Sequence, residues 1–510
     1  MLARRLLPAA LLLGLQRAGP AQGRLLALDT LNPQLLEAEY AVRGAILDKA
    51  EEIQRQIRAN PTSHGFPFDS IIPCNIGNPQ ALKQKPLSFV REVLSLVANP
   101  ALLDIAGNLG QAFGADSIRR ARMYLDRIPE GIGAYSNSQG IEVVREEVAA
   151  FIEQRDGHPS SAGNIFLTDG ASAGVRMLYQ AMLRPGNNDG ILVPIPQYPL
   201  YSALLSLLGG KLVGYYLDES KGWGVTIAEL KRALASGRSS GVNVRALVII
   251  NPGNPTGQCL GRAEMEEIVA FAAEEGLVLM ADEVYQENVW DASKSFTSFK
   301  KVAVEMGEAS KGFELVSYHT ASKGFFGECG IRGGYFEVYN MDPDVKAQLY
   351  KLASITLCAN TAGQIAIGLM VNPPREGNES YSTYAAERDG ILASLERRAV
   401  KLAAALNSLE GVTTNQPEGA MYLFPQVKLP GAAVREAQGR GMTPDTFYCL
   451  RLLEATGIVT VPGSGFKQVD GTYHFRTTFL PPEDAIDQVT ERMAGFHAAF
   501  MREFAARTDL

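Results

Sequence analysis

A glycine-rich loop between residues 317 and 334 gathers side chains that can bind a phosphate and form a covalent bond. It contains several hydroxyl groups together with Lys323 and Arg332. A desolvated lysine can form a Schiff base with a carbonyl compound, and an arginine binds phosphate with charge-assisted hydrogen bonds. A lone lysine is also an ordinary surface charge, so this loop alone leaves both interpretations open.

Two other short segments follow predicted strands and present polar groups. Residues 168–174 begin a predicted helix, whose N-terminus favours an anion, and Ser172 adds a hydroxyl group. Residues 251–257 contain two Asn-Pro steps that project asparagine amides, including that of Asn254, from a strand end. Each segment is also consistent with a plain structural turn.

Asp282 stands at the end of the next apolar run. A carboxylate in that place is costly to bury unless it is paired. A cationic nitrogen on a ligand would supply the partner. The alternative is an exposed carboxylate at the end of a strand.

The elements that must position these residues alternate between strand and helix. A stripe of Met265, Ile268, Val269 and Ala272 predicts a helix over residues 262–276, which ends at its glycine. Another helix is predicted to follow residues 169–174 and to run through Met182. Strands are predicted at residues 165–168, 190–194, 211–217, 245–251 and 277–285. This alternation predicts an α/β fold with a parallel sheet, and ligands of such sheets bind at the carboxyl ends of the strands.

The rest of the chain is predicted to be helical at residues 31–57 and 384–408, with a mixed α+β region over residues 412–510. We therefore expect four parts. They are a leader at residues 1–28, an N-terminal arm with the first part of a small domain at residues 29–109, a large domain at residues 110–380 and the remainder of the small domain at residues 381–510.

Composition excludes several classes of function. A net charge of −7 argues against a surface for nucleic acid. Five cysteines and five histidines, with no CxxC pair, predict neither a disulfide framework nor a metal site. No segment is apolar over enough residues to cross a membrane. We expect small molecules as partners, rather than nucleic acid or membrane.

Residues 1–28 contain four arginines and no acidic residue. Such a leader is typical of an organelle transit peptide. It predicts a location in the mitochondrial matrix, with a plastid, another organelle or the cytoplasm as alternatives. A secretory signal, with residues 6–15 as its apolar segment, also stays open.

The ordered motifs resemble the fold-type I aminotransferases, which use pyridoxal 5′-phosphate. Within that family, residues 75–80, 134–140, 322–334 and 473–478 are similar to the alanine aminotransferase subfamily. The resemblance implies a large domain with a mostly parallel seven-stranded sheet and a smaller α+β domain. It also implies a homodimer with shared active sites that acts on amino acids and 2-oxo acids.

The same resemblance implies roles around the cofactor ring. Lys323 would bind the cofactor covalently and move the substrate proton. Asp282 would face the pyridine nitrogen, while Asn254 and Tyr285 would donate to the phenolic oxygen. Tyr198 would stack on the ring, although it is also consistent with an ordinary core tyrosine.

A second set of residues would hold the cofactor phosphate. Arg332 would be its cation, although it stands nine residues after Lys323 where many aminotransferases show eight. Tyr135 would reach the phosphate of the neighbouring subunit, unless it is an ordinary core tyrosine of its own chain. The remaining phosphate contacts would come from Ala171, Ser172, Thr320 and Ser322.

Arg476 would bind the substrate α-carboxylate, and the backbone of Gly77 would close over it. The implied reaction is L-alanine plus 2-oxoglutarate giving pyruvate plus L-glutamate. A glutamate–glyoxylate aminotransferase of the same subfamily is the alternative. A lyase on the same cofactor and a regulator that senses an amine are more remote alternatives.

Overall fold

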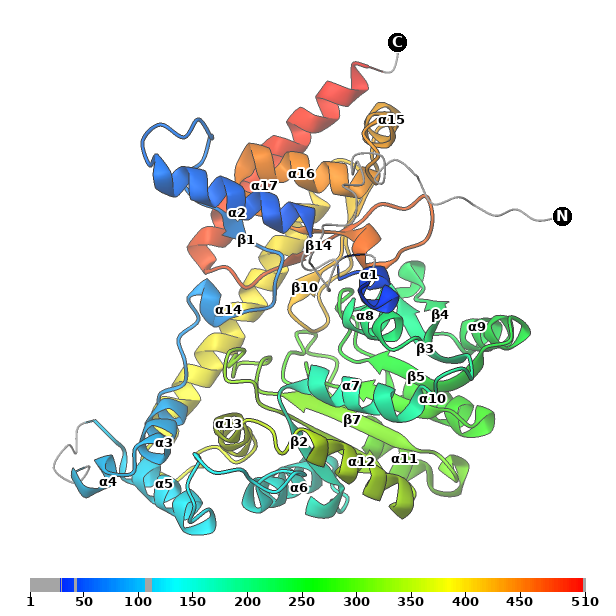
Figure 1. Ribbon diagram of the computed structural model, residues 1–510. Helices are drawn as coiled ribbons and strands as arrows, with labels where there is room; N and C mark the ends of the chain where they lie inside the picture. Colours follow the sequence, from blue (N-terminus) through cyan, green and yellow to red (C-terminus); the bar gives the residue numbers. More distant parts are fainter. Residues whose placement is uncertain (1–27, 29, 41–43, 106–111, 508–510) are drawn as a thin grey trace.

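The computed structural model describes residues 28, 30–40, 44–105 and 112–507 (Figure 1). Within these residues, seven strands form one sheet in the order β2-β8-β7-β6-β5-β3-β4. Strand β8 runs antiparallel to both of its neighbours, and the other pairs are parallel. This confirms the predicted fold class. The strands are β2 (Ile165–Thr168), β3 (Asp189–Ile195), β4 (Lys211–Tyr216), β5 (Asn243–Ile250), β6 (Val278–Asp282), β7 (Leu315–Thr320) and β8 (Gly334–Tyr339).

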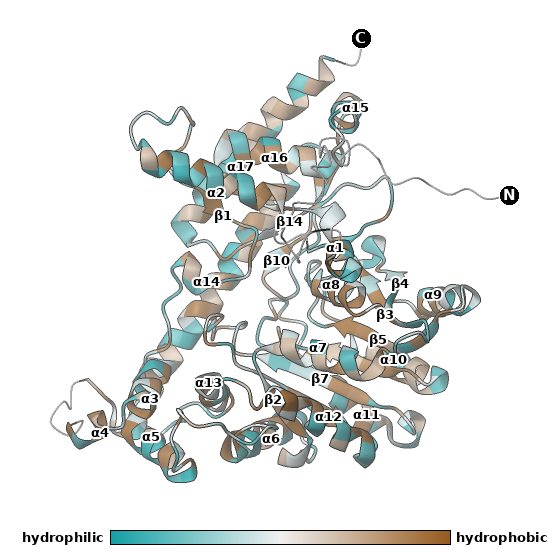
Figure 2. Cartoon of the chain, viewed as in Figure 1, coloured by the Kyte–Doolittle hydropathy of each residue, from teal (hydrophilic) through white to brown (hydrophobic). Residues whose placement is uncertain are grey.

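The central strands are apolar on both faces because helices cover both faces of the sheet, as Figure 2 shows by their hydropathy. Alternate residues of a strand point to opposite faces, so Leu192 and Val193 belong to different hydrophobic clusters. One face is covered by α7 (Ala171–Met182), α8 (Leu200–Leu207) and α12 (Pro343–Ile355). The other face is covered by α9 (Ile227–Ser239), α10 (Arg262–Glu275) and α11 (Phe299–Met306).

A third cluster lies at the β2 end of the sheet. Helix α13 is buried along most of its length because it packs between α3, α6 and strand β8. The helices in this region are α3 (Ser88–Ala98), α4 (Leu102–Ile105), α5 (Ala115–Arg127), α6 (Glu142–Asp156) and α13 (Thr361–Val371).

A fourth cluster joins the N-terminal helix α2 to the C-terminal region. Its helices are α2 (Ala45–Ala59), α14 (Tyr381–Asn407), α15 (Gly431–Gly439), α16 (Pro444–Thr456) and α17 (Glu483–Ala505). The short strands in this half of the molecule are β1 (Ile72–Pro73), β9 (Val412–Thr413), β10 (Tyr422–Leu423), β11 (Gln426–Val427), β12 (Ile458–Val459), β13 (Val461–Pro462) and β14 (Phe475–Thr478). Helices and short strands therefore mix here, as predicted for residues 412–510.

The long helix α14 connects the two halves of the molecule (Figure 1). Tyr384, in its first turn, packs in the cluster at the β2 end of the sheet. Leu395, Leu402 and Leu406 pack in the C-terminal cluster. The predicted bounds of 384–408 are close to the observed ones.

Two sequence predictions were wrong in extent. The single helical stretch over residues 31–57 is two helices, α1 (Pro33–Glu37) and α2, because Ala38 adopts an extended conformation. The strand predicted over residues 277–285 ends at Asp282, where the chain turns. The prediction for α10 is confirmed, and Gly276 ends it with a φ of 65°.

No helix in the described part of the chain is long and apolar enough to span a bilayer. The same residues contain no cluster of three or more histidine, cysteine, aspartate or glutamate side chains that could hold a metal ion. The predicted leader, up to residue 27, lies outside the described residues.

Candidate active site

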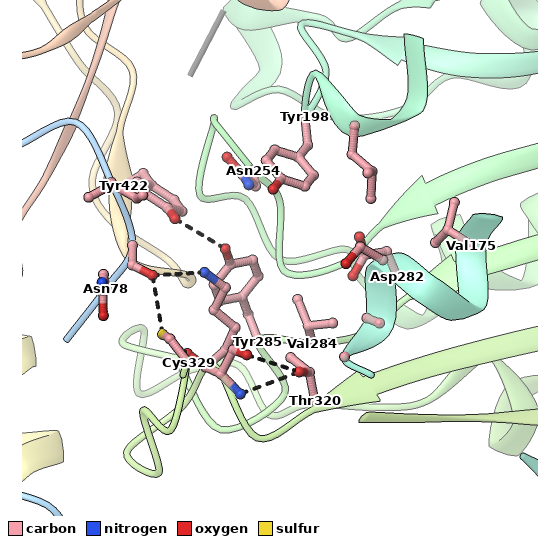
Figure 3. Close-up of a pocket in the computed structure, with 18 of the residues that line it drawn as sticks. Asn78, Val175, Tyr198, Asn254, Asp282, Val284, Tyr285, Thr320, Cys329 and Tyr422 are labelled. Carbon is pink, nitrogen blue, oxygen red and sulfur yellow. Dashed lines mark hydrogen bonds between the residues drawn. The ribbon is translucent and has the colours of Figure 1, made fainter. Parts of the chain in front are cut away.

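A cavity of about 410 Å³ opens at the carboxyl ends of β6 and β7 (Figure 3). The short strand β10 and strand β14 close it from the C-terminal region. All but one of the residues that the sequence singled out line this cavity. They are Gly77, Ala171, Ser172, Tyr198, Asn254, Asp282, Tyr285, Thr320, Ser322, Lys323, Arg332 and Arg476.

Tyr135 is the exception, since it is not among the described residues that line the cavity. Its side chain is 78% exposed. The alternative of a core tyrosine within its own chain is therefore wrong. Its expected contact with a neighbouring subunit stays a prediction.

Lys323 projects from the loop after β7 into the middle of the cavity. Its Nζ donates to the carbonyl oxygen of Gly77 at 3.1 Å and lies 5.8 Å from the centre of the Tyr285 ring. A Cβ on Gly77 would lie 2.9 Å from this Nζ and would overlap the hydroxyl of Tyr422. Only glycine therefore lets the backbone approach the lysine this closely.

Asp282 is buried at the end of β6 and has an incomplete set of partners. The Tyr201 hydroxyl donates to its Oδ2 at 2.6 Å, whereas its Oδ1 has no hydrogen-bond partner among the described residues. Burial raises the pKa of Asp282, against the opposing hydrogen bond from Tyr201. A buried acceptor without a partner is uncommon in proteins, and a cationic N–H group of a ligand would satisfy it.

The role of Tyr201 was missed, although this residue lies three positions after Tyr198. It lies in the first turn of α8, fully buried behind the cavity, and supports Asp282 from there. The regular i, i+3 spacing was the available signal.

The N-terminus of α7 and Arg332 form a concave site for an anion. Arg332 Nη2 donates to the carbonyl oxygen of Asp169 at 2.9 Å and lies 3.5 Å from the Ser172 hydroxyl. Gly170 has a φ of 82°, and a Cβ there would lie 2.7 Å from Nη2. The free N–H groups of a helix N-terminus together with a guanidinium group favour a phosphate.

Arg476 supplies a second guanidinium group to the cavity. Its Nη1 donates to Asn254 Oδ1 at 3.1 Å and its Nη2 donates to the carbonyl oxygen of Asn75 at 2.5 Å. The guanidinium group lies between two rings, 4.2 Å from the centre of Tyr422 and 4.9 Å from that of Phe466. Its Nε has no partner within the described chain, so the group retains capacity to bind a carboxylate.

Two further tyrosines at the cavity were missed. The hydroxyl of Tyr40 lies 2.8 Å from that of Tyr198. Tyr422 points toward Tyr285, whose hydroxyl donates to it at 3.4 Å (Figure 3). Neither belongs to a recognisable motif, because Tyr40 follows α1 and Tyr422 lies on a two-residue strand.

The charge of the cavity is visible in the pKa of Tyr422. Burial alone would raise it, but the cations of Lys323 and Arg476 bring it below its ordinary value. The cavity therefore favours negative charge near Tyr422 and positive charge near Asp282.

This arrangement fits a flat, phosphorylated heterocycle with a basic ring nitrogen. The anion site could hold the phosphate of such a molecule, and the unpaired Oδ1 of Asp282 could accept from its nitrogen. Lys323 lies within the same cavity. Pyridoxal 5′-phosphate, which the motifs imply, has a phosphate, a ring nitrogen and an aldehyde that a lysine can attack.

Comparison with known proteins agrees with this site. Residues 115–493 match the family model described as aminotransferase class I and II. The chain is 55% identical to "Alanine aminotransferase 1, mitochondrial" of Arabidopsis thaliana, over 94% of this chain and 87% of that protein. It is 52% identical to "Glutamate--glyoxylate aminotransferase 1" of the same plant, over 93% and 96% of the two chains. A solved structure, alanine aminotransferase from Pyrococcus furiosus, shares the fold with a TM-score of 0.71 at 23% identity, over 92% of this chain and all of that one.

Proposed function

Because the chain belongs to the class I and II aminotransferases, we propose that it is an alanine aminotransferase that uses pyridoxal 5′-phosphate. Members of this family generally depend on that cofactor. The observation that carries the proposal is the meeting of Lys323, Asp282 and Arg476 in one cavity. Lys323 could bind the cofactor covalently, and Asp282 could pair with its ring nitrogen. Arg476 could bind the carboxylate of the substrate.

The cofactor would be held at both ends. Asp282 would accept from the pyridine nitrogen, and Tyr201 keeps the carboxylate in place. Asn254 and Tyr285 would hydrogen-bond the phenolic oxygen, and Tyr198 would stack on the ring. The phosphate would be held by Ala171, Ser172, Thr320, Ser322 and Arg332.

When bound, the cofactor supplies an electron sink that acidifies the Cα–H bond of the amino acid. Asp282 would favour a proton on the ring nitrogen, because its negative charge would lie beside that nitrogen. Arg476 binds the α-carboxylate in a bidentate manner and fixes Cα. The amine of Lys323 then moves the proton from Cα, and the Gly77 carbonyl orients that amine.

We propose the reaction L-alanine plus 2-oxoglutarate giving pyruvate plus L-glutamate. The glutamate–glyoxylate aminotransferase of Arabidopsis, at 52% identity, supports a second candidate reaction. A single-turnover assay separates the two. Holoenzyme is mixed with L-alanine, L-glutamate, glycine or L-aspartate, and the absorbance of the bound cofactor is followed.

L-Alanine and L-glutamate are expected to convert the cofactor, and 2-oxoglutarate is expected to restore it. Failure of L-alanine in this assay, with success of another donor, contradicts the proposal. Recovery by glyoxylate at a higher kcat/KM than by pyruvate favours the second candidate.

We further propose a homodimer in which Tyr135 contacts the cofactor phosphate of its partner. The 78% exposure of the side chain in one chain supports this contact. Tyr135→Phe is expected to weaken cofactor binding in the dimer. Unchanged cofactor affinity contradicts the shared site.

A mitochondrial location is also proposed, since the Arabidopsis relative is named mitochondrial. Residues 1–28 fused to a fluorescent protein are expected to direct it into mitochondria. A cytoplasmic signal from this fusion contradicts the proposed location.

A further inference from the structure

His474 lies two residues before Arg476 and is almost fully buried, with 2% of the residue exposed. Its ring stacks on Phe424, with ring centres 4.8 Å apart and planes 2° from parallel. The edge of Trp223 packs against it at 5.6 Å. A polar ring in such surroundings must satisfy both of its nitrogens within the protein.

Both ring nitrogens of His474 face hydrogen-bond acceptors. Nε2 lies 3.1 Å from each carboxylate oxygen of Glu219. Nδ1 lies 2.8 Å from Oε1 of Gln468. The amide of Gln468 cannot be turned around without a loss, because its Nε2 donates to Asp445 Oδ2 at 2.9 Å.

An imidazole between two acceptors must donate from both nitrogens. Only the imidazolium form carries two N–H groups, so this geometry requires a positive charge on His474. Glu219 supplies the opposite charge, and Asp445 lies behind Gln468. Gln426 also donates to Glu219 Oε2, at 3.1 Å, which keeps the carboxylate directed at the ring.

The ion pair joins two separate regions of the chain. Glu219 belongs to the 3-10 turn η4 (Glu219–Lys221), between β4 and α9 of the large sheet. His474 directly precedes β14, and its carbonyl oxygen accepts from the N–H of Gly463 at 2.7 Å. A Cβ on Gly463 would lie 2.8 Å from His474 Cβ, so the two backbones are packed too closely for any residue but glycine at position 463.

We propose that His474, held as an imidazolium by Glu219 and Gln468, is a positioning residue for Arg476, which binds the substrate carboxylate. The ion pair ties the start of β14 to the part of the chain that carries Asn254 and Lys323. Arg476, in the same strand, thereby keeps its distance from the reacting amine. This inference rests on the proposed function only for the identity of the substrate that Arg476 binds.

Glu219→Gln and His474→Gln test the inference in the holoenzyme. Each is expected to raise KM for both L-alanine and 2-oxoglutarate about tenfold, the order expected for loss of one charged hydrogen bond. The kcat and the amount of bound cofactor stay within about twofold, since the clamp acts by binding substrate. The double variant is expected to lose no more than either single one, because the two residues act as a unit.

His158→Gln is the matched control. His158 and Glu305 form another histidine–glutamate pair, at 3.4 Å, on the surface and outside the cavity. The control variant is expected to retain the KM of the unmodified enzyme. A purely structural role for His474 would lower the melting temperature and bound cofactor while leaving KM unchanged, and that result overturns the inference.

A measurement on the unmodified protein covers the case in which His474→Gln fails to fold. The chain has only five histidines, so ring N–H signals of ¹⁵N-histidine-labelled holoenzyme can be assigned one by one. Glu219→Gln, which changes a partly exposed side chain, identifies the signals of His474. Two ring N–H signals at neutral pH support the imidazolium, and a single one overturns it.

The outcome is separable from that of the proposed function. If L-alanine fails as donor but KM for the true donor rises in both variants, the proposed reaction is wrong and the positioning role stands. If L-alanine is a substrate and its KM is unchanged in both variants, the proposed reaction stands and the positioning role is wrong.

Discussion

Asp282 and Glu283 are neighbouring buried carboxylates that point to opposite faces of the sheet. Asp282 Oδ2 accepts from the Tyr201 hydroxyl, and its Oδ1 has no partner within hydrogen-bond distance in the described chain. Glu283 Oε1 accepts from the backbone N–H of Phe299 at 2.8 Å, and Oε2 accepts from the Ser317 hydroxyl at 2.5 Å. On the cavity side, Asp282 Oδ1 is therefore free to accept from a ligand. On the far side, both oxygens of Glu283 are paired with groups of the protein.

Two lysines repeat this contrast. Lys323 in the cavity donates to a single backbone carbonyl. Lys300, on the far side, is buried against the carboxylate of Glu337 at 2.5 Å, and the Ser160 hydroxyl donates to the same carboxylate. In these two pairs, the cavity residue keeps an unpaired oxygen or an unpaired charge, whereas the far-side residue is paired with groups of the protein.

The sharpest test of this comparison exchanges each lysine for alanine. Lys323→Ala is expected to lower the transamination rate by about 10⁴-fold, the upper range for loss of a proton-transfer group, with little change in melting temperature. Lys300→Ala is expected to reduce the free energy of unfolding by about 3–5 kcal/mol, because it leaves a buried carboxylate unpaired. Activity assays and denaturant unfolding measure the two effects.

Lys323→Ala should also lose the absorbance of covalently bound cofactor. A retained signal contradicts the role of Lys323. A large loss of stability in Lys323→Ala, with none in Lys300→Ala, breaks the comparison itself.

The adjacent carboxylates give the next largest effect. Asp282→Asn keeps the shape of the side chain but removes its charge, so kcat is expected to fall by about 10²–10³-fold, as for loss of one preorganised electrostatic contact. Glu283→Gln is expected to change kcat by less than about threefold, since its amide can still accept from Phe299. Steady-state kinetics of the two variants, at equal cofactor saturation, provide the comparison; equal losses in both contradict it.

Two buried tyrosines form a matched pair with a smaller effect. Tyr201→Phe removes the hydrogen bond to Asp282 and is expected to lower kcat about tenfold, as one charged hydrogen bond contributes about 1.5 kcal/mol. Tyr215→Phe removes a bond of 2.8 Å to the carbonyl oxygen of Val248 and is expected to leave kcat unchanged. Equal kcat values for the two variants would show that Tyr201 does not support Asp282.

The smallest effect concerns the pH dependence of stability. Burial raises the pKa of Glu283 to about 7 from its ordinary value of 4.5, against the charge of Arg155. Between these values the folded state holds more protons than the unfolded state, so the contribution of Glu283 to stability falls as pH rises from about 4.5 to about 7.

Unfolding free energies of the unmodified protein and Glu283→Gln, measured across that range, isolate this contribution. Burial lowers the pKa of His319 to about 3, which acts in the opposite direction, but its effect cancels in the difference between the two proteins. The free energy of unfolding of the unmodified protein, minus that of Glu283→Gln, is expected to decrease as pH rises. A difference that does not change with pH contradicts the raised pKa of the buried Glu283.

Much of the sheet could be predicted because its strands are short apolar runs with clear turns between them. The bounds of β2 and α10 follow from local residues alone, with Gly276 ending the helix. The break between α1 and α2 could not be read in this way, because the pattern of charged and apolar residues continues through Ala38. Its extended conformation is a property of that backbone in the folded chain.

The site was predictable where a residue belonged to an ordered motif, as Lys323 and Asp282 do. Tyr422 reaches the cavity from a two-residue strand that pairs with β14. No local sequence pattern predicts that pairing. The far-side partners of Glu283 were missed for a related reason. Phe299 and Ser317 come together with it only when α11 packs against β6 and β7.

Helix α14 has a mechanical consequence, because its two ends are fixed in different clusters. A helix of 27 residues is about 40 Å long, so a bend of about 5° displaces one end by roughly 3.5 Å relative to the other. Gly390 lies within this span, with no described atom closer than 4 Å to the place of a Cβ. Alanine there would stabilise the helix by about 1 kcal/mol without a clash. A small change in the direction of α14 would therefore move the C-terminal region relative to the cavity by a few ångströms.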